Sequence, residues 1–260
     1  MNEQENLEVF DAPELIEDFS VDPSHYRELA TDDFLLLESE PPNLGATKLY
    51  GRGDTTRLSF SLKDSGIGNR VFFGDGVRGR LSLGITGNNA TIFIGRDVSF
   101  SDQHIGSRHD GDCIAIGNDV STTGPGRWIS GLRCGDPCEP KLVIGDACVI
   151  ARDVVLRNSD GHPFFDPKLE AQVLPATNTL VIEPHVWLGE RCAIIKPVRI
   201  GAFAVVGFSA VITANIPAHH SAFGNPAVTK LNDCKVWCWD DTEAGLERAS
   251  RYLARFPYPK

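Results

Sequence analysis

A period of six residues runs through positions 182–216, where the sequence reads IEPHVW-LGERCA-IIKPVR-IGAFAV-VGFSAV-ITANI. The first position of each block is aliphatic, at Ile182, Leu188, Ile194, Ile200, Val206 and Ile212. The fifth position is small or apolar, at Val186, Cys192, Val198, Ala204, Ala210 and Ile216. The same register recurs at Ile144, Ile150 and Leu156, with Cys148 and Val154 in the fifth position. Weaker copies begin at Ile67, Phe73, Ile94 and Ile116.

A period of six fits neither an α-helix nor an ordinary hairpin sheet, but it fits a β-helix made of very short strands. The fifth position and the next first position are two residues apart, so in a strand both point inward. Glycine follows the first position at Gly189, Gly201 and Gly207, where the chain must turn a corner. A β-sandwich with a chance register is the alternative, and six consecutive matches argue against it. The sequence therefore predicts an all-β chain folded as a parallel β-helix.

The rest of the chain divides by composition. Residues 1–45 carry 13 acidic side chains and one basic one, whereas the remainder carries 22 acidic and 24 basic. We therefore interpret residues 1–50 as an acidic N-terminal arm, partly helical or partner-docking, that is dispensable for chemistry. Residues 51–230 are expected to form the β-helix, with loop insertions near 122–140 and 163–181. Residues 231–260 form a C-terminal extension with a short helix, in which Leu246, Ala249 and Leu253 share one face.

Composition also narrows the class of protein. The chain is 42% hydrophobic and 23% charged, and no apolar stretch is long enough to span a bilayer. The N-terminus lacks the basic start and apolar core of a secretory signal, so we expect a soluble, cytoplasmic protein. Seven cysteines, with Cys148 and Cys192 at predicted core positions, favour reduced thiols over a disulfide framework. No basic surface typical of nucleic-acid binding is apparent.

Three motifs carry a resemblance to a known family. They are Ser159-Asp160-Gly161-His162-Pro163, Val186-Trp187-Leu188-Gly189 and Gly224-Asn225-Pro226-Ala227. In order and spacing the chain resembles the hexapeptide-repeat acyltransferases, above all the galactoside, xenobiotic and polysaccharide O-acetyltransferases. The likeness covers roughly 142–230, is looser over 51–133 and is absent before 51. It implies that the β-helix is left-handed, which no rule of sheet chirality predicts.

His162 is the candidate catalytic residue. The register predicts an inward residue at 162, but Gly161 lets the chain leave the coil and Pro163 favours an extended backbone at the histidine. A histidine placed there is displayed at a loop entry rather than packed. Histidine ordinarily has a pKa near 6.5 and can accept a proton at neutral pH. The resemblance implies that His162 is the general base that takes the proton of the acceptor hydroxyl, a role worth about 10²–10⁴-fold.

The resemblance assigns further residues to binding. Asp160 would orient the imidazole or contact the acceptor, and Trp187 would contact the acceptor or the cofactor, although an exposed turn aspartate and a structural tryptophan are the alternatives. Acetyl-coenzyme A would lie between two subunits of a homotrimer, along Gly207, Phe208 and Thr213. A lysine commonly follows that threonine in the family, whereas this chain has Ala214. The substitutes for the phosphate contact are Lys230 and, further away, Lys196, Arg199, His219 and His220. No metal is expected.

The sequence thus predicts an acetyl-coenzyme A-dependent O-acetyltransferase acting on a sugar hydroxyl, in a cell-surface polysaccharide or its precursor. A non-catalytic β-helix scaffold is the alternative from another class. A γ-class carbonic anhydrase needs three histidines on zinc, and only His104 and His109 are suitably spaced. Two Cys-x₃-Cys pairs, Cys134/Cys138 and Cys234/Cys238, leave a structural zinc site open. Residues 1–50 are too short for the nucleotide-binding domain of a sugar nucleotidyltransferase.

Overall fold

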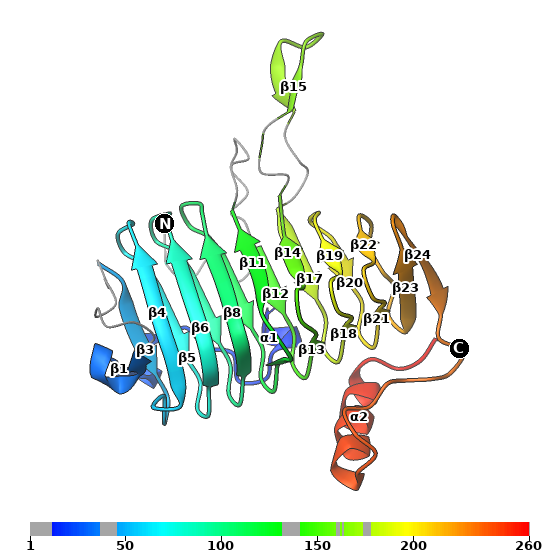
Figure 1. The fold of residues 1–260 in the computed structure, drawn as a ribbon, viewed down its shortest axis with the longest axis horizontal. Helices are drawn as coiled ribbons and strands as arrows, with labels where there is room; N and C mark the ends of the chain where they lie inside the picture. The colour runs from blue at the N-terminus through cyan, green and yellow to red at the C-terminus, as the bar shows by residue number, and fades with distance from the viewer. Residues whose placement is uncertain are drawn as a thin grey trace.

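The structure of the 260-residue chain is a computed structural model that describes residues 12–36, 46–131, 141–159, 162, 164–173 and 178–259. Short parallel strands stack coil upon coil into an elongated prism, with a helix at the C-terminal end and a hairpin projecting from its middle (Figure 1). Over the described ranges, no helix has the length and apolar character needed to cross a membrane.

One side of the prism is a row of parallel strands, one from each coil, here called the first row. Its strands are β3 (Lys48–Gly51), β5 (Arg70–Phe73), β7 (Thr91–Ile94), β9 (Cys113–Ile116), β12 (Lys141–Ile144), β17 (Thr179–Ile182) and β20 (Arg199–Ile200). In the last coils a residue pairs with the one eighteen positions later, as Val181 does with Arg199. Three blocks of six therefore make one coil there.

The other two sides belong to one continuous sheet. The second row contains β10 (Ser121–Thr122), β13 (Val149–Ile150), β18 (Trp187–Leu188), β21 (Val205–Val206) and β23 (His220–Gly224), and it ends on the antiparallel strand β24 (Ala227–Leu231). The third row contains β11 (Gly126–Ser130), β14 (Val155–Arg157), β19 (Ala193–Ile194) and β22 (Val211–Ile212). The two rows join at β8 (Ser99–Ser107), which pairs with β10 through Ser99 and with β11 through residues 103–107. The earlier coils use the long strands β4 (Leu58–Asp64) and β6 (Arg78–Ile85) in the same way.

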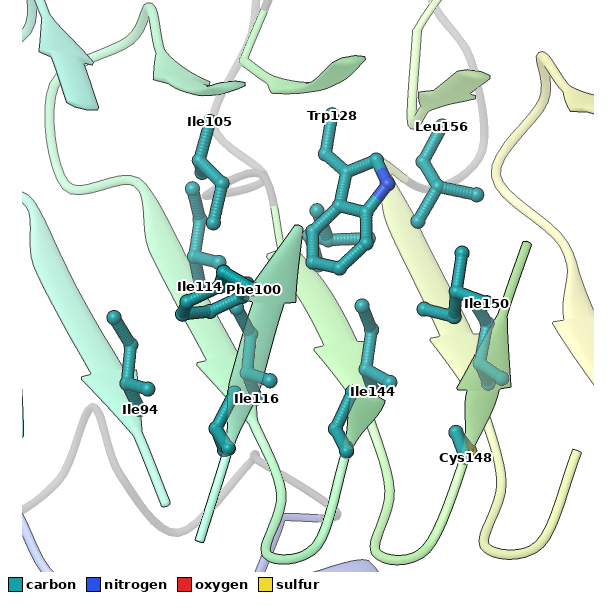
Figure 2. Packing of buried hydrophobic residues seen from close by; sticks show 14 of the residues in the cluster. Ile94, Phe100, Ile105, Ile114, Ile116, Trp128, Ile144, Cys148, Ile150 and Leu156 are labelled. Atoms are coloured by element: carbon teal, nitrogen blue, oxygen red, sulfur yellow. The ribbon is translucent and has the colours of Figure 1, made fainter. Parts of the chain in front are cut away.

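The core fills the inside of the prism. All twelve residues that the six-residue register of 182–216 turns inward are buried, and so are Cys148 and Val154, which confirms the register. Figure 2 shows successive layers of this core, with Ile94, Ile116 and Ile144 aligned along the first row and Trp128 among the inward side chains. Ile67 is the exception: it is 66% exposed, in a turn ahead of β5, so the expectation that it begins a repeat is wrong.

The two expected insertions differ from each other. Residues 164–173 form a hairpin, β15 (Phe164–Asp166) paired with β16 (Ala171–Val173), which projects from the prism (Figure 1). The expected loop extends too far at its end, because Thr179–Ile182 is the first-row strand β17. Near 122–140 the coil continues through β11, whose Trp128 is buried in the core. The segment before residue 132 is therefore not an insertion, and 132–140 lie outside the described residues.

The described part of the predicted N-terminal arm lies against the prism. It contains the short helix α1 (Ala12–Leu15), two 3₁₀ turns (Pro23–His25 and Thr31–Asp33) and the strands β1 (Arg27–Glu28) and β2 (Leu35–Leu36), which pair with β3 and β4. Leu15 and Ile16 are buried in one apolar cluster with the outward side chains of the first row, a cluster that also contains Phe72 and Phe93. Residues 12–36 thus cover one side of the β-helix.

The C-terminal helix α2 (Glu243–Arg255) is present as expected, and Thr242 caps it by accepting a hydrogen bond from the Gly245 amide. The expected face is partly right: Ala249 is buried and Leu253 packs partly buried against the cluster of Phe203 and Tyr252, but Leu246 is not part of it. The helix buries Gly245, Ala249 and Tyr252, whereas Leu246 is 54% exposed. Tyr252 packs on Phe203 at a corner of the prism, and this aromatic contact turns the Leu246 side of the helix to solvent.

Candidate functional site

His162 lies where the third row gives way to the projecting hairpin, between β14 and β15, and it is exposed. The expectation that it is displayed rather than packed is met in this structure. Its neighbours Asp160, Gly161 and Pro163 lie outside the described residues, so the role predicted for Asp160 remains a prediction.

A buried polar ladder lies beneath the start of this segment. The Asn158 side chain donates to the Ser130 hydroxyl (Nδ2–Oγ, 2.8 Å) and accepts from the Gly131 amide (3.1 Å), and Ser130 donates to the Asp112 carboxylate (Oγ–Oδ1, 2.6 Å). The other Asp112 oxygen has no hydrogen-bond partner among the described residues. Burial raises the pKa of Asp112 from 3.8 to about 6, although the hydrogen bond from Ser130 opposes the shift. The ladder fixes the coil four residues before His162.

Trp187 points outward from the second row and is 42% exposed. Its ring lies 6.3 Å from that of Trp237, which comes from the C-terminal extension. Together with Trp239, Val149 and Ala151 they line a groove of about 500 Å³, here called the aromatic groove. Tryptophan rings combine a large apolar surface with one hydrogen-bond donor, so the groove suits a ligand that is partly apolar and partly polar.

Trp237 is fixed by two reciprocal hydrogen bonds to His185. The Trp237 indole donates to the His185 carbonyl (2.9 Å), and His185 Nε2 lies 2.9 Å from the Trp237 carbonyl, while the two rings stack at 4.3 Å. Burial lowers the pKa of His185. A neutral imidazole that donates through Nε2 leaves Nδ1 without a proton, and Nδ1 has no hydrogen-bond partner in the described structure.

Sequence reasoning missed this anchor. His185 and Phe203 are eighteen residues apart and occupy the same corner of successive coils, both with positive φ, so their rings lie 4.6 Å apart and tilted by 39°. His219 continues the stack on Phe203. The spacing of eighteen between His185 and Phe203 was visible in the sequence and could have predicted this contact. Trp237, which covers His185, lies outside the repeats, so its position could not be predicted from them.

The predicted cofactor residues are spread over two edges of the prism. Phe208 is exposed and lies under the Arg191 guanidinium at 5.7 Å, and Lys230 is exposed on β24 opposite Ser221. Thr213 is exposed just after the third-row strand β22. Packing explains why residue 207 is a glycine, because a β-carbon there would lie 2.4 Å from the Phe223 ring.

Two of the substitutes for the phosphate contact are engaged elsewhere. His219 is fully buried with Nε2 2.9 Å from the Phe256 carbonyl, and Arg199 pairs with Glu183 at 2.6 Å. His219 is thus unavailable to a phosphate. His220 lies 2.8 Å from the Ala218 carbonyl, and Lys196 is half-buried.

The histidines and cysteines considered for metal binding do not form a cluster among the described residues. His104 contacts the Ser82 hydroxyl and His109 contacts the Asp110 carbonyl. Cys234 and Cys238 are free thiols, and Cys134 and Cys138 lie outside the described residues. Within the part of the chain that the structure describes, no three histidine, cysteine or acidic side chains gather as a metal ion requires.

The structure does not bring His162 and Trp187 together within one chain. His162 follows the third row, whereas Trp187 begins a strand of the second row, and no contact joins them among the described residues. The hairpin that follows His162 extends away from the prism (Figure 1). Its side chains Phe165 and Leu169 are exposed.

The chain is similar to bacterial O-acetyltransferases. It is 33% identical over 162 residues to a polysialic acid O-acetyltransferase of Escherichia coli O1:K1, covering 58% of this chain and 50% of that protein. It is 33% identical over 101 residues to a galactoside O-acetyltransferase of Lactococcus lactis, covering 38% and 48%. The chain thus spans about half the length of these relatives. No family model matches it.

A solved structure confirms the architecture. The crystal structure of the polysialic acid-specific acetyltransferase NeuO aligns with a TM-score of 0.56 and 26% identity, over 76% of this chain and 98% of that one. The polysialic acid O-acetyltransferase OatWY aligns with a TM-score of 0.55 and 20% identity, over 79% and 98%, and shows the fold alone. The resemblance and the fold predicted from the sequence are confirmed: the chain is a left-handed parallel β-helix of hexapeptide repeats, similar to bacterial sugar O-acetyltransferases.

Proposed function

We propose that this protein is an O-acetyltransferase that moves an acetyl group from acetyl-coenzyme A to a hydroxyl of a sugar, in a polysaccharide or its precursor. The observation that carries the proposal is an exposed histidine, His162, where a hexapeptide coil gives way to a projecting hairpin. The similarity to polysialic acid and galactoside O-acetyltransferases supports both the reaction and the class of acceptor.

In the proposed reaction His162 takes the proton of the acceptor hydroxyl as its oxygen attacks the thioester carbonyl. The carbon–sulfur bond then breaks, and the imidazolium returns the proton to the coenzyme thiolate, so that an acetyl ester and free coenzyme A are released. The neutral alcohol is a poor nucleophile, and a positioned base is typically worth about 10²–10⁴-fold. Trp187, Gly207, Phe208, Thr213 and Lys230 are proposed to bind the substrates, with Asp160 beside the base.

We further propose a homotrimer that acts in the cytoplasm. His162 and Trp187 belong to different rows of strands, which supports a site that combines the histidine of one chain with the tryptophan of another. The exposed Phe165 and Leu169 of the hairpin supply apolar contacts for a neighbouring subunit. Free thiols at Cys113, Cys148, Cys192, Cys234 and Cys238 agree with a reducing compartment.

The experiment that tests the function is a thiol-release assay with acetyl-coenzyme A and a panel of sugars, polysaccharides and sugar nucleotides. Release of coenzyme A that depends on an acceptor, with an acetyl ester found on that acceptor by mass spectrometry, is the expected result. If no acceptor raises release above the rate in buffer, a silent scaffold is the better description.

A further inference from the structure

A second groove continues from the aromatic groove along the second row of strands. It has a volume of about 440 Å³ and is lined by Arg78, Ser99, Ser121 and Trp239 together with Asp97, Asp119 and Arg248. We call it the polar groove. Trp239 lines both grooves, so the two meet at its ring.

The two grooves follow one line of outward residues. Arg78 pairs with Ser99, Ser99 with Ser121, Ser121 with Val149, and Val149 with Trp187, each on the next strand. Adjacent strands lie about 4.8 Å apart, so Ser99 and Trp187 are about 14 Å apart along the prism. A ligand that reaches both ends is longer than a single sugar.

Apart from Arg78, which donates to the Gly76 carbonyl, the polar side chains of the groove are available to a ligand. Among the described residues, the carboxylates of Asp97 and Asp119 and the guanidinium of Arg248 make no hydrogen bond or ion pair, and the hydroxyls of Ser99 and Ser121 are unengaged. Carboxylates accept hydrogen bonds, guanidinium groups donate them and serine does both. A sugar ring presents hydroxyls that match all three and carbon–hydrogen faces that pack on a tryptophan ring.

The charge of the groove selects among sugars. Asp97 and Asp119 balance Arg78 and Arg248, so the charged side chains that line the groove sum to zero. A polyanion, such as the sialic acid polymer named in the relatives, would meet no net positive charge here, and like charges brought together disfavour binding. We infer that the polar groove is an accessory subsite that holds a distal residue of a neutral, hydroxyl-rich acceptor glycan. This inference rests on the proposed function, because the glycan in the groove is the acceptor.

The test is binding of oligosaccharide ladders to the full chain without coenzyme, measured by calorimetry and ligand-detected NMR. The probes are malto-, cello- and β-1,4-galacto-oligosaccharides of one to six units, and oligosialic acid of the same lengths. At least one neutral ladder should bind, with a Kd that falls about tenfold between the monosaccharide and the tetrasaccharide. Oligosialic acid should bind at least about tenfold more weakly than the neutral ladder.

Variants locate the effect. Trp239→Ala should remove the gain in affinity with length, and Trp239→Phe should restore most of it. The double variant Asp97→Asn/Asp119→Asn removes two negative charges, so it should reduce the difference in Kd between neutral and sialic oligomers. Asparagine tolerates the positive φ of both positions, so the backbone should be unchanged. Asp153→Asn is the matched control, since Asp153 has the same backbone conformation at an exposed corner outside both grooves and should leave the gap unchanged.

The outcomes separate this inference from the proposed function. If no neutral ladder binds, if oligosialic acid binds as tightly, or if the gain with length survives in Trp239→Ala, the inference is wrong. Thiol release with monosaccharide acceptors is measured in parallel. Transfer without any gain from length would overturn the subsite alone, whereas length-dependent binding without transfer to any acceptor would overturn the proposed function.

Discussion

At the residue scale, the proposed chemistry places one proton transfer on His162. His162→Ala removes the base but leaves the thioester and the positioning of both substrates, so kcat should fall at least about 10²-fold while a residual rate persists. Coenzyme A affinity should change little, because His162 is assigned to the acceptor proton. Steady-state kinetics and calorimetry with coenzyme A measure the two effects.

The control for this change is His109→Ala, which removes a histidine whose Nδ1 lies 2.8 Å from the Asp110 carbonyl and which has no part in the proposed reaction, so turnover should stay near normal. Circular dichroism establishes that both variants are folded. Near-normal turnover in His162→Ala, or a parallel loss of coenzyme binding, would show that His162 is not the general base.

Asp112 gives a pH dependence of stability. Its pKa rises from 3.8 to about 6 on folding, so its contribution to stability is present below pH 4 and is lost as the pH rises through 6. A pKa that is higher by about two in the folded state corresponds to about 3 kcal/mol in the free energy of unfolding. Asp112→Asn cannot ionise and still accepts from Ser130, so it should match the natural protein near pH 4 and exceed its stability at pH 8 by up to about 3 kcal/mol.

Urea unfolding between pH 4 and 8 measures this difference. Asp110→Asn is the matched control, because Asp110 is exposed and the backbone hydrogen bond from Asn88 lowers its pKa. The ionised form of Asp110 therefore stabilises the fold, and Asp110→Asn should lower the stability rather than raise it. A stability difference for Asp112→Asn that stays constant from pH 4 to 8 would mean that Asp112 does not titrate in this range.

The residues of the site were predictable to different degrees. His162 interrupts a register that demands an aliphatic side chain, so its display was visible in the sequence. The ladder of Asp112, Ser130 and Asn158 was not, because its members come from different coils with no common spacing. Trp237 and Trp239 were not either, since they follow the last coil and their place depends on where the extension folds back.

At the scale of elements, residues 12–36 act as a cover for the first row rather than as a detached arm. Leu15 and Ile16 are buried in one apolar cluster with the outward side chains of the first row, and the Leu15 carbonyl accepts from the Asp146 amide. The net negative charge of this segment suggested that it is an arm distinct from the β-helix. The apolar side chains between its acidic residues instead pack it on the first row. The expectation that this segment is dispensable therefore needs a direct test.

Leu15→Ala and Ile16→Ala should each lower the free energy of unfolding by about 2–5 kcal/mol, because each leaves a cavity over the first row. Urea unfolding measures the loss. Leu35→Ala is the control, since Leu35 is an exposed leucine of the same segment and should cost less than about 1 kcal/mol. Equal effects at all three positions would mean that the segment does not pack as described.

At the scale of the whole molecule, the period of six predicted the later coils better than the earlier ones. The strands of residues 181–194 pair with residues eighteen positions later, whereas the first-row pairings Arg70 with Thr91 and Thr91 with Cys113 span 21 and 22. Coils of that length use long strands such as β6 and β8 that bend round a corner, so their buried residues alternate and show no hexad. The earlier coils therefore gave only weak repeats, and Ile67 fell in a turn.

The whole molecule also decides whether the site is shared between chains. His162 and Trp187 belong to different rows, so a trimer in which neighbours meet would join the histidine of one chain to the tryptophan of the next. Light scattering should give the mass of three chains. His162→Ala and Trp187→Ala should each be nearly inactive alone, because each lacks one component of every site.

Mixing the two inactive variants during refolding then distinguishes a shared site from a self-contained one. With random assembly in equal amounts, a shared site draws an intact histidine from half of the chains and an intact tryptophan from the other half, so about a quarter of the sites should be complete. A site contained in one chain would remain incomplete in every assembly, and the mixture would show no recovery. The control is the same mixture combined after each variant has assembled alone, which should stay inactive unless subunits exchange. Recovery near a quarter of the natural activity supports the shared site, and a mixture as inactive as its components contradicts it.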